Sequence, residues 1–260
     1  MIIKLEDFKS ELEDIEFSMP ENIRFSGRLL IIGGSHQNFS VATEALNLSQ
    51  SHGAGNSILA LPDNLKHLLP KNLPTNINLL PSDKNGSFNL EAGEHLLSLS
   101  LHSEGILLPG MLGRGSQTSQ VILSLVQQLN LPVIMAGDSV LFLQNEVFYL
   151  QMPNLFLLLS LSLVQRLMGK FEVISLRDQP NIIEQKLKMI ANNIKFSFCF
   201  ILAGWIYAVI EGEVIRIKLN KNYEDIMMPK LASSLASVKT WSKAEQKFNF
   251  MLATKITFQL

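Results

Sequence analysis

The sequence contains a single cysteine, Cys199, among 260 residues. One cysteine cannot form a disulfide within its own chain, so a disulfide-stapled scaffold is excluded, and a reducing compartment such as the cytoplasm is the simplest expectation. Cys199 lies inside the apolar run 196–202, where no charged neighbour would stabilise a thiolate. We therefore expect a buried, unreactive thiol and not a nucleophile.

Charge is also scarce. Charged residues make up 17% of the chain, the formal net charge is −1, and Lys and Arg are dispersed along the sequence. Such a chain has no overall field that attracts polyanions, so we expect no nucleic-acid partner. The five histidines do not fall at the spacings of a zinc site, and no metal-binding residues are assigned.

Long hydrophobic runs are missing as well. The two most apolar stretches, 155–163 and 196–210, are shorter than the roughly 18 residues that a membrane-spanning helix requires. We expect buried strands or core helices there, and no membrane association. The N-terminal stretch 1–17 mixes acidic with apolar side chains and lacks the form of a signal peptide, which favours a cytoplasmic protein.

Apolar residues, in contrast, make up 47% of the chain, which argues against disorder and suffices for a sizeable core. Short, continuously apolar segments alternate with helical patterns from about residue 27 onward. The predicted strands are 28–32, 57–61, 105–108 and 132–136, and the predicted helices among them are 40–49 and 118–130. This order is typical of an α/β fold in which helices cover both faces of a mainly parallel sheet.

The remaining segments complete the expected organisation. Residues 62–90 contain four prolines and predict an irregular or short-helical connection. In the last third, the pattern predicts a helix over 182–192 and a hairpin turning at Glu211-Gly212. A capping box at Ser242–Glu245 predicts the start of the final helix. No linker or repeat divides the chain, so we expect a single domain over 1–260, with a helical or irregular lead-in over 1–26.

Ligands on parallel sheets usually bind beyond the carboxyl ends of the strands. Here those ends carry Gly33-Gly34-Ser35, the Gly-rich turn 110–115, and Gly137-Asp138. Arg114 suits a phosphate group, although the glycines around it could equally serve the turn alone. Asp138 could hold Mg²⁺ or a ribose hydroxyl, or it could cap the segment that follows. The Gly-x-Gly-x-x-Gly fingerprint of dinucleotide-binding domains is absent.

Three segments resemble one protein family in their order and spacing: 27–35 with the Gly-Ala-Gly stop at 53–55, 105–114, and 132–141. They are similar to the nucleotide-dependent NAD(P)H-hydrate dehydratases, a ribokinase-like branch. The resemblance implies a three-layer ribokinase-like domain that binds ADP or ATP with Mg²⁺. It also implies a metabolite-repair reaction, in which the hydroxyl of NAD(P)H hydrate is phosphorylated and phosphate is then eliminated, the action of a carbon–oxygen lyase. A homo-oligomer is a further expectation.

The strand ends and the resemblance together imply a set of nucleotide- or substrate-binding positions. These positions are Gly34, Ser35, Val41, Gly110, Gly113, Arg114, Asp138 and Asn154. Two of them depart from the family's residues: Asn154 stands where the family has the histidine of a Thr-Pro-His turn, and Val41 stands where it has alanine.

The catalytic loop departs further. In the family, a Gly-Thr-Gly-Asp loop holds phosphate oxygens with backbone N–H groups and supplies an aspartate base. The aligned segment here reads Ile226-Met-Met-Pro229, so two small, permissive glycines are replaced and proline removes a donor. Glu224 or Asp225 becomes the base only if the register shifts, and Asp225 is the candidate that we retain.

Two interpretations follow. In the first, the chain is a divergent dehydratase-like protein with impaired catalysis, a pseudoenzyme that either binds a nucleotide or nicotinamide cofactor or serves as an assembly partner. In the second, it is an active ADP- or ATP-dependent NAD(P)H-hydrate dehydratase. A sugar or vitamin kinase of the wider ribokinase fold would need the same missing loop.

Overall fold

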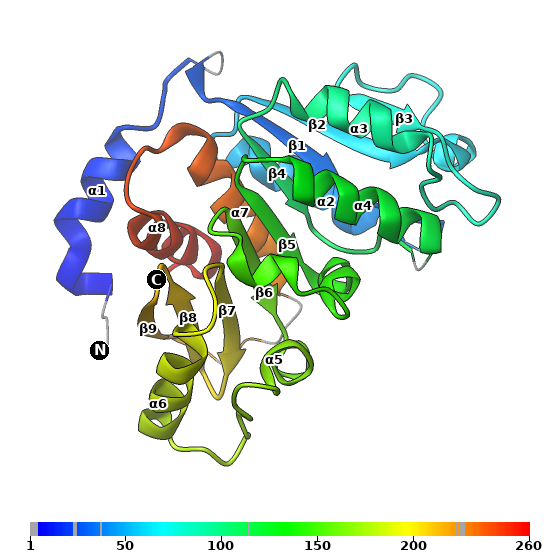
Figure 1. The fold of residues 1–260 in the computed structure, drawn as a ribbon. Helices are drawn as coiled ribbons and strands as arrows, with labels where there is room; N and C mark the ends of the chain where they lie inside the picture. The colour runs from blue at the N-terminus through cyan, green and yellow to red at the C-terminus, as the bar shows by residue number, and fades with distance from the viewer. Residues whose placement is uncertain (1–4, 23–24, 37, 114, 222, 224–226) are drawn as a thin grey trace.

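The computed structural model describes residues 5–22, 25–36, 38–113, 115–221, 223 and 227–260 (Figure 1). These residues form a nine-stranded sheet in the order β3-β2-β1-β4-β5-β6-β7-β8-β9. Neighbouring strands from β3 to β7 run parallel, and β8 and β9 pair antiparallel at one edge. The strands are β1 Arg28–Ile32, β2 Asn56–Pro62, β3 Ile77–Leu80, β4 Gly105–Leu108, β5 Val133–Ala136, β6 Leu155–Leu159, β7 Ser197–Leu202, β8 Trp205–Ile210 and β9 Glu213–Lys218.

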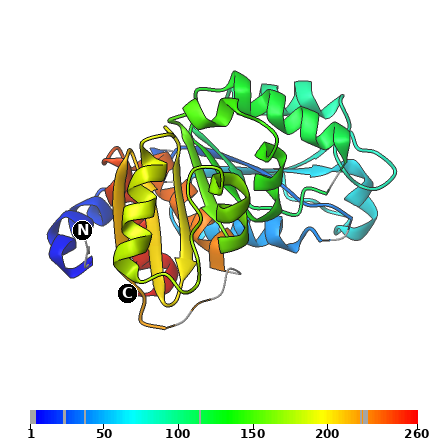
Figure 2. The same cartoon turned by 60° about the horizontal axis from the view of Figure 1, so that its bottom comes forward.

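Helices cover both faces of this sheet, so the fold has three layers. One layer contains α3 (Ala92–Ser100), α4 (Ser116–Gln128), α5 (Leu161–Met168) and α6 (Pro180–Ala191). The other contains α2 (Ser40–Ser51), α7 (Met228–Trp241) and α8 (Gln246–Phe258), with α1 (Lys9–Phe17) packed on α8. Figure 2 shows α6 in front of the hairpin strands and the orange and red α7 and α8 behind them. Short 3-10 helices, at Leu5–Phe8, Asp63–Leu68, Gly137–Leu143 and Phe148–Gln151, complete the connections.

Strands β4, β5 and β6 are continuously apolar because they are buried on both sides. Successive side chains of a strand point to opposite faces, so Leu30 packs in the core under α3 and α4, whereas Ile31 packs in the core under α2 and α7. Both side chains are 0% exposed. The strands predicted from the sequence at 28–32, 57–61, 105–108 and 132–136 are thereby confirmed.

Helix α7 lies across the centre of the sheet and brings small side chains to the interface. It contacts β1, β4, β5 and β6 and packs along α2. Ser233, Ser234 and Ser237 are fully buried on it. The Ser237 hydroxyl donates to the carbonyl of Ser49 at 3.2 Å, and the Ser234 hydroxyl lies 3.1 Å from Nδ1 of His52. Small side chains let the two helices approach closely, and hydrogen bonds to backbone or neighbouring groups make the burial of their hydroxyls favourable.

The hairpin, with Glu211-Gly212 at its turn, is also as predicted. Cys199 is 0% exposed, so the prediction of a buried thiol is confirmed. Burial raises the pKa of this thiol, which disfavours the reactive thiolate. Among the helices of the described residues, none combines the length and the apolar character needed to cross a bilayer.

Two expectations need correction. Residues 62–90 are not merely a connection, because they contain the edge strand β3 in addition to the short helix 63–68. The final helix begins at Gln246 and not at a Ser242 cap, since Ser242 ends α7 instead. Its hydroxyl donates to Oδ1 of Asn249 at 2.6 Å and accepts from the N–H of Ala244 at 3.2 Å, which braces the turn between α7 and α8.

The start of β1 gives a first stability prediction. Gly27 has φ +73°, and a Cβ built on it would lie 2.4 Å from the carbonyl oxygen of Thr240 at the end of α7. We expect Gly27→Ala to lower the free energy of unfolding by about 2–5 kcal/mol, because it adds a backbone clash to the strain of a left-handed conformation. Urea denaturation measures the loss. The matched control is Gly212→Ala, where φ is +84° but nothing lies within 4 Å, and about 1–2 kcal/mol is expected. Equal losses in the two variants would contradict the packing argument.

His52 gives a pH prediction. Burial between α2 and α7 lowers the pKa of His52 below its ordinary value of 6.5. Between that value and the lower folded-state pKa, the unfolded chain binds more protons than the folded chain, so stability falls as the pH drops through 6.5. The drop in Tm between about pH 7.5 and pH 5.5 should be smaller in His52→Gln than in the wild type, and the argument fails if the two drops are equal.

Candidate functional site

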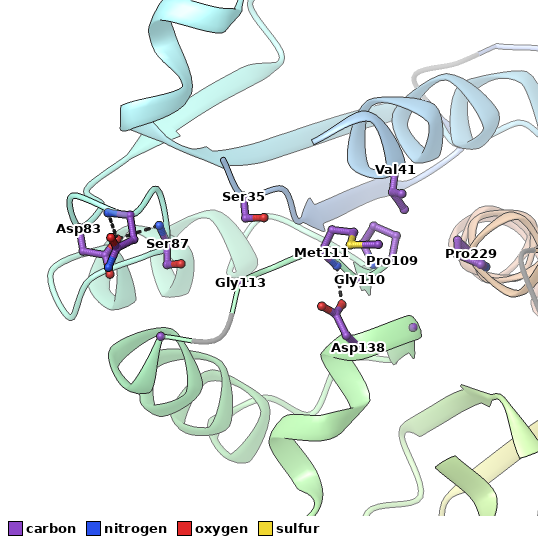
Figure 3. Close-up of a pocket in the computed structure, with 13 residues that line it drawn as sticks. Ser35, Val41, Asp83, Ser87, Pro109, Gly110, Met111, Gly113, Asp138 and Pro229 are labelled. Atoms are coloured by element: carbon purple, nitrogen blue, oxygen red, sulfur yellow. Dashed lines mark hydrogen bonds between the residues drawn. The ribbon is translucent and has the colours of Figure 1, made fainter. Parts of the chain in front are cut away.

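A cleft of about 750 Å³ opens at the carboxyl ends of the central strands (Figure 3). The loops that follow β1, β3, β4 and β5 form its walls, together with the first turns of α2 and α7. Its lining residues are Ser35, Val41, Asp83, Asn85, Ser87, Pro109, Gly110, Met111, Gly113, Gly115, Gly137, Asp138 and Pro229. This is the edge of the sheet at which open α/β folds bind their ligands.

Glycines shape the floor of the cleft because side chains would not fit there. Gly110 has φ +112°, and a Cβ on it would lie 3.1 Å from a carboxylate oxygen of Asp138. Gly113 has φ +79°, and a Cβ on it would lie 2.3 Å from the Ser87 hydroxyl oxygen. The turn after β4 therefore requires these glycines for its backbone conformation and because side chains would not fit. This is the structural role that the sequence offered as an alternative to phosphate binding.

Asp138 lies at the middle of the cleft, next to this turn. Its Oδ1 accepts a hydrogen bond of 2.5 Å from the N–H of Met111, whose φ of +59° is unusual for a residue with a side chain. Asp138 is the second residue of the 3-10 helix Gly137–Leu143, whose N-cap position is Ala136. The carboxylate thus fixes the Gly110–Met111 turn and faces the cleft, and the alternative of a helix cap is wrong.

Two smaller hollows adjoin the cleft at Asp138. Arg166 of α5 lines both of them, together with Leu141. One hollow, of about 460 Å³, reaches the first turn of α4, and the other, of about 330 Å³, reaches the end of β6 and Met228. The three spaces together extend along the carboxyl edge of the sheet from the end of β3 to the end of β6.

The far wall of the cleft is a loop in which the sequence predicted no binding residues. Residues 81–91 connect β3 to α3, and Asp83 organises them by accepting hydrogen bonds from the N–H groups of Asn85 at 2.8 Å and Ser87 at 3.0 Å. Asn64 ties the loop down through the carbonyls of Asp83 and Lys84. The residues Ser82-Asp-Lys-Asn-Gly86 are typical turn formers, and this signal alone does not separate a binding loop from any other loop.

The near wall is the start of α7. Pro229 stands in the first turn of this helix and lines the cleft, and Met228 beside it is 2% exposed. The first turn of α7 contains no acidic residue. The described start of α7 therefore presents the apolar ring of Pro229 to the cleft, and the proline removes one backbone N–H donor from this turn.

The structure brings five of the predicted binding residues into this cleft. They are Ser35, Val41, Gly110, Gly113 and Asp138. Gly34 adjoins them but serves the turn, because a Cβ on it would lie 2.8 Å from Leu61. Arg114 and Asp225, and also Glu224, lie outside the described residues.

Asn154 is not at this site. It immediately precedes β6, at the amino end of the strand, and the cleft lies at the carboxyl ends. Its side-chain amide donates to the carbonyls of Leu129 at 3.1 Å and Leu131 at 2.7 Å, which join α4 to β5. The prediction that Asn154 binds a ligand is therefore wrong. The residue instead holds the segment before β6 to the connection between α4 and β5.

The charged groups among the described lining residues of the cleft are the carboxylates of Asp83 and Asp138. Over the described part of the chain, no three His, Cys, Asp or Glu side chains lie close enough together to hold a metal ion. Mg²⁺ is commonly held by one or two carboxylates together with nucleotide phosphates. Asp138 is suited to that shared arrangement, but the described residues do not fit a metal held by protein groups alone.

Comparison with solved structures shows a ribokinase-like fold. The chain is similar to a ribokinase-like superfamily protein from Enterococcus faecalis V583, with a TM-score of 0.70 and 14% identity over 92% of this chain and 81% of that one. A hypothetical protein from Streptococcus mutans has a TM-score of 0.75 and 15% identity over 100% and 89% of the two chains. The ADP/ATP-dependent NAD(P)H-hydrate dehydratase from Bacillus subtilis, co-crystallised with ATP/Mg²⁺, has a TM-score of 0.64 and 14% identity over 95% and 86%.

At these identities the likeness extends to the fold alone, and the three-layer ribokinase-like architecture predicted from the sequence is confirmed. No protein-family model matches the sequence, and a comparison with curated proteins also finds no match.

The contact between Gly113 and Ser87 can be tested as a coupled pair. Gly113→Ala should lower the free energy of unfolding by about 2–4 kcal/mol, because its Cβ meets the Ser87 hydroxyl in a left-handed conformation. In a Ser87→Ala background the same change should cost only about 1–2 kcal/mol, since the backbone strain remains while the clash with the hydroxyl is gone. Urea denaturation of the four proteins measures the coupling, and simple additivity would contradict it.

Proposed function

We propose that this chain is a divergent, NAD(P)H-hydrate dehydratase-like protein that binds a nucleotide or nicotinamide cofactor in the cleft and has lost the family's catalysis. The observation that carries the proposal is the start of α7, where Pro229 lines the cleft and Met228 is buried beside it. The cleft itself supports retained binding, because its volume of about 750 Å³ is that of a ligand site.

The fold supports the nucleotide as the ligand. A solved structure of the same fold is an ADP/ATP-dependent NAD(P)H-hydrate dehydratase co-crystallised with ATP/Mg²⁺. In this chain the glycine turns after β1 and β4, together with Asp138, lie at the carboxyl edge where such a ligand would be bound.

The loss of catalysis follows from what the reaction requires. Transfer of a phosphoryl group to a hydroxyl needs a base within hydrogen-bond reach of that hydroxyl and N–H donors directed at the phosphate. Pro229 has no N–H group, and the first turn of α7 offers no carboxylate. A first turn of this kind allows binding, but it supplies no base and has one N–H donor fewer than a turn without proline.

One observation favours the alternative of an active ADP- or ATP-dependent dehydratase. Asp138 holds a carboxylate in the middle of the cleft, and among the described residues only its Oδ1 is engaged in a hydrogen bond, from the N–H of Met111. A carboxylate so placed could take the proton of a substrate hydroxyl in place of the missing loop aspartate. Asp225, the other candidate base, lies outside the described residues.

A repair assay with parallel binding measurements distinguishes the proposed binding protein from the active dehydratase. NADH hydrate is offered with ADP and then with ATP and Mg²⁺, and the absorbance of restored NADH is followed. We expect no turnover above the uncatalysed rate, together with a rise in Tm on adding ADP, ATP or NADH. Turnover that disappears in Asp138→Asn would establish the active alternative and overturn the proposed loss.

A cleft-filling variant shows where the ligand binds. Val41→Phe places an aromatic ring at the cleft wall and should abolish the ligand-induced rise in Tm. Asn47→Phe, on the exposed side of the same helix, is the matched control and should retain it. If the ligand-induced rise in Tm is lost in both variants, or in neither of them, the ligand binds elsewhere.

A further inference from the structure

Two histidine side chains that are far apart in the sequence lie side by side next to the far wall of the cleft. His36 follows Ser35 in the loop after β1, and His67 belongs to the 3-10 helix Asp63–Leu68 after β2. Their ring centroids are 5.9 Å apart, and the ring planes are inclined by 33°. Both residues are exposed, so a hydrated ion can reach the two rings without any opening of the fold.

The backbone of His36 is held from two sides. Ser35 and Asn38 close the turn that contains it by exchanging backbone hydrogen bonds of 3.3 Å and 3.1 Å. Gly86 packs against His36 from the loop 81–91, and a Cβ on Gly86 would lie 2.9 Å from Cβ of His36. The point from which this imidazole extends is therefore fixed by the fold.

The short helix that carries His67 is tied to the same loop. The side-chain amide of Asn64 donates to the carbonyls of Asp83 at 3.3 Å and Lys84 at 3.1 Å. The N–H of Asn64 donates to the hydroxyl of Ser82 at 3.1 Å. Because one loop contacts both segments, the two rings are arranged before a ligand binds, and binding costs less conformational entropy than it would for two independent side chains.

The separation of the rings decides what they can share. A divalent transition metal lies about 2.0–2.1 Å from an imidazole nitrogen, and hence about 3.2 Å from the ring centroid. Two rings that bind the same ion therefore have centroids up to about 6.4 Å apart, and the observed 5.9 Å is inside this limit. Imidazole nitrogens suit Zn²⁺, Cu²⁺ and Ni²⁺, whereas Mg²⁺ and Ca²⁺ prefer oxygen ligands.

We infer that His36 and His67 form a two-histidine site for a divalent transition-metal ion, such as Zn²⁺, beside the cleft. The described residues contain no group of three His, Cys, Asp or Glu side chains suited to a metal, so water or another small ligand completes the coordination. The spacing of the histidines along the chain did not predict this site, because only the fold brings the two rings together. The site does not depend on the nucleotide proposed for the cleft.

The test follows the full chain, freed of metal with a chelator, as ZnCl₂ is added, with MgCl₂ as the comparison. ZnCl₂ at about ten times its Kd should raise the Tm by about 3–5 °C, and MgCl₂ at the same concentration should leave it unchanged. His36→Gln and His67→Gln each leave one imidazole. Either substitution should weaken Zn²⁺ binding, measured by isothermal titration calorimetry, by about tenfold or more.

A third variant, His67→Phe, separates metal binding from a simple contact between two rings. Phenylalanine keeps an aromatic ring beside His36 but has no nitrogen to bind a metal. The Tm without metal should therefore stay close to that of the wild type, while Zn²⁺ binding weakens as it does in His67→Gln. Undiminished Zn²⁺ binding in His67→Phe would show that the two rings only pack together, and would overturn the inference.

His95→Gln and His102→Gln are the matched controls. Each removes an exposed histidine that makes no ring contact with another histidine in the described part of the chain. Both should bind Zn²⁺ as tightly as the wild type does. The inference fails if the wild type does not bind Zn²⁺, or if the control variants lose as much affinity as His36→Gln and His67→Gln.

The outcomes also separate this inference from the proposed function. Zn²⁺ binding that requires both His36 and His67 establishes the metal site even if no nucleotide raises the Tm. A rise in Tm with ADP or NADH, without Zn²⁺ binding at the two histidines, supports the proposed function and overturns the metal site.

Discussion

The burial of both faces of the central sheet is the constraint on which the rest of this structure depends. Because helices cover both faces, the central strands consist almost entirely of apolar side chains, and the polar groups near the sheet are concentrated in the loops at the two ends of the strands. The carboxyl ends of the parallel strands meet at one edge, so loops far apart in the sequence converge there. The cleft is the outcome, with Ser35, Ser87 and Asp138 contributed by three such loops.

This constraint also explains what the sequence could predict. A strand that is buried on both sides is visible as a short apolar run, and β1, β2, β4 and β5 are found in this way. The glycines at 110 and 113 follow such a run, so their place at the strand ends could be expected. Strand β3 was not predicted because it lies at the edge of the sheet, where most of its side chains are only partly buried. In addition, the segment 62–81 that contains it has four prolines, which are typical of irregular connections.

The rest of the site depends on contacts between distant segments, which a single sequence does not contain. Asp83 and Ser87 lie in a loop of ordinary turn-forming residues, and only the fold brings that loop over Gly113. The resemblance to the family's Thr-Pro-His turn implied a ligand role for Asn154, but the direction of β6 puts this residue at the opposite edge. Ser242 has the spacing of a helix cap, yet its hydroxyl pairs with Asn249 inside the next helix.

The start of α7 has a consequence for how this chain can change. Proline in the first turn of a helix restricts the unfolded chain and suits the helical backbone, and the neighbouring Met228 adds a buried side chain to the core. Glycines in the same positions would remove both contributions. A change to glycine at these two positions would therefore lower the stability of the helix start, so any additional backbone freedom at this wall of the cleft would come with a loss of stability.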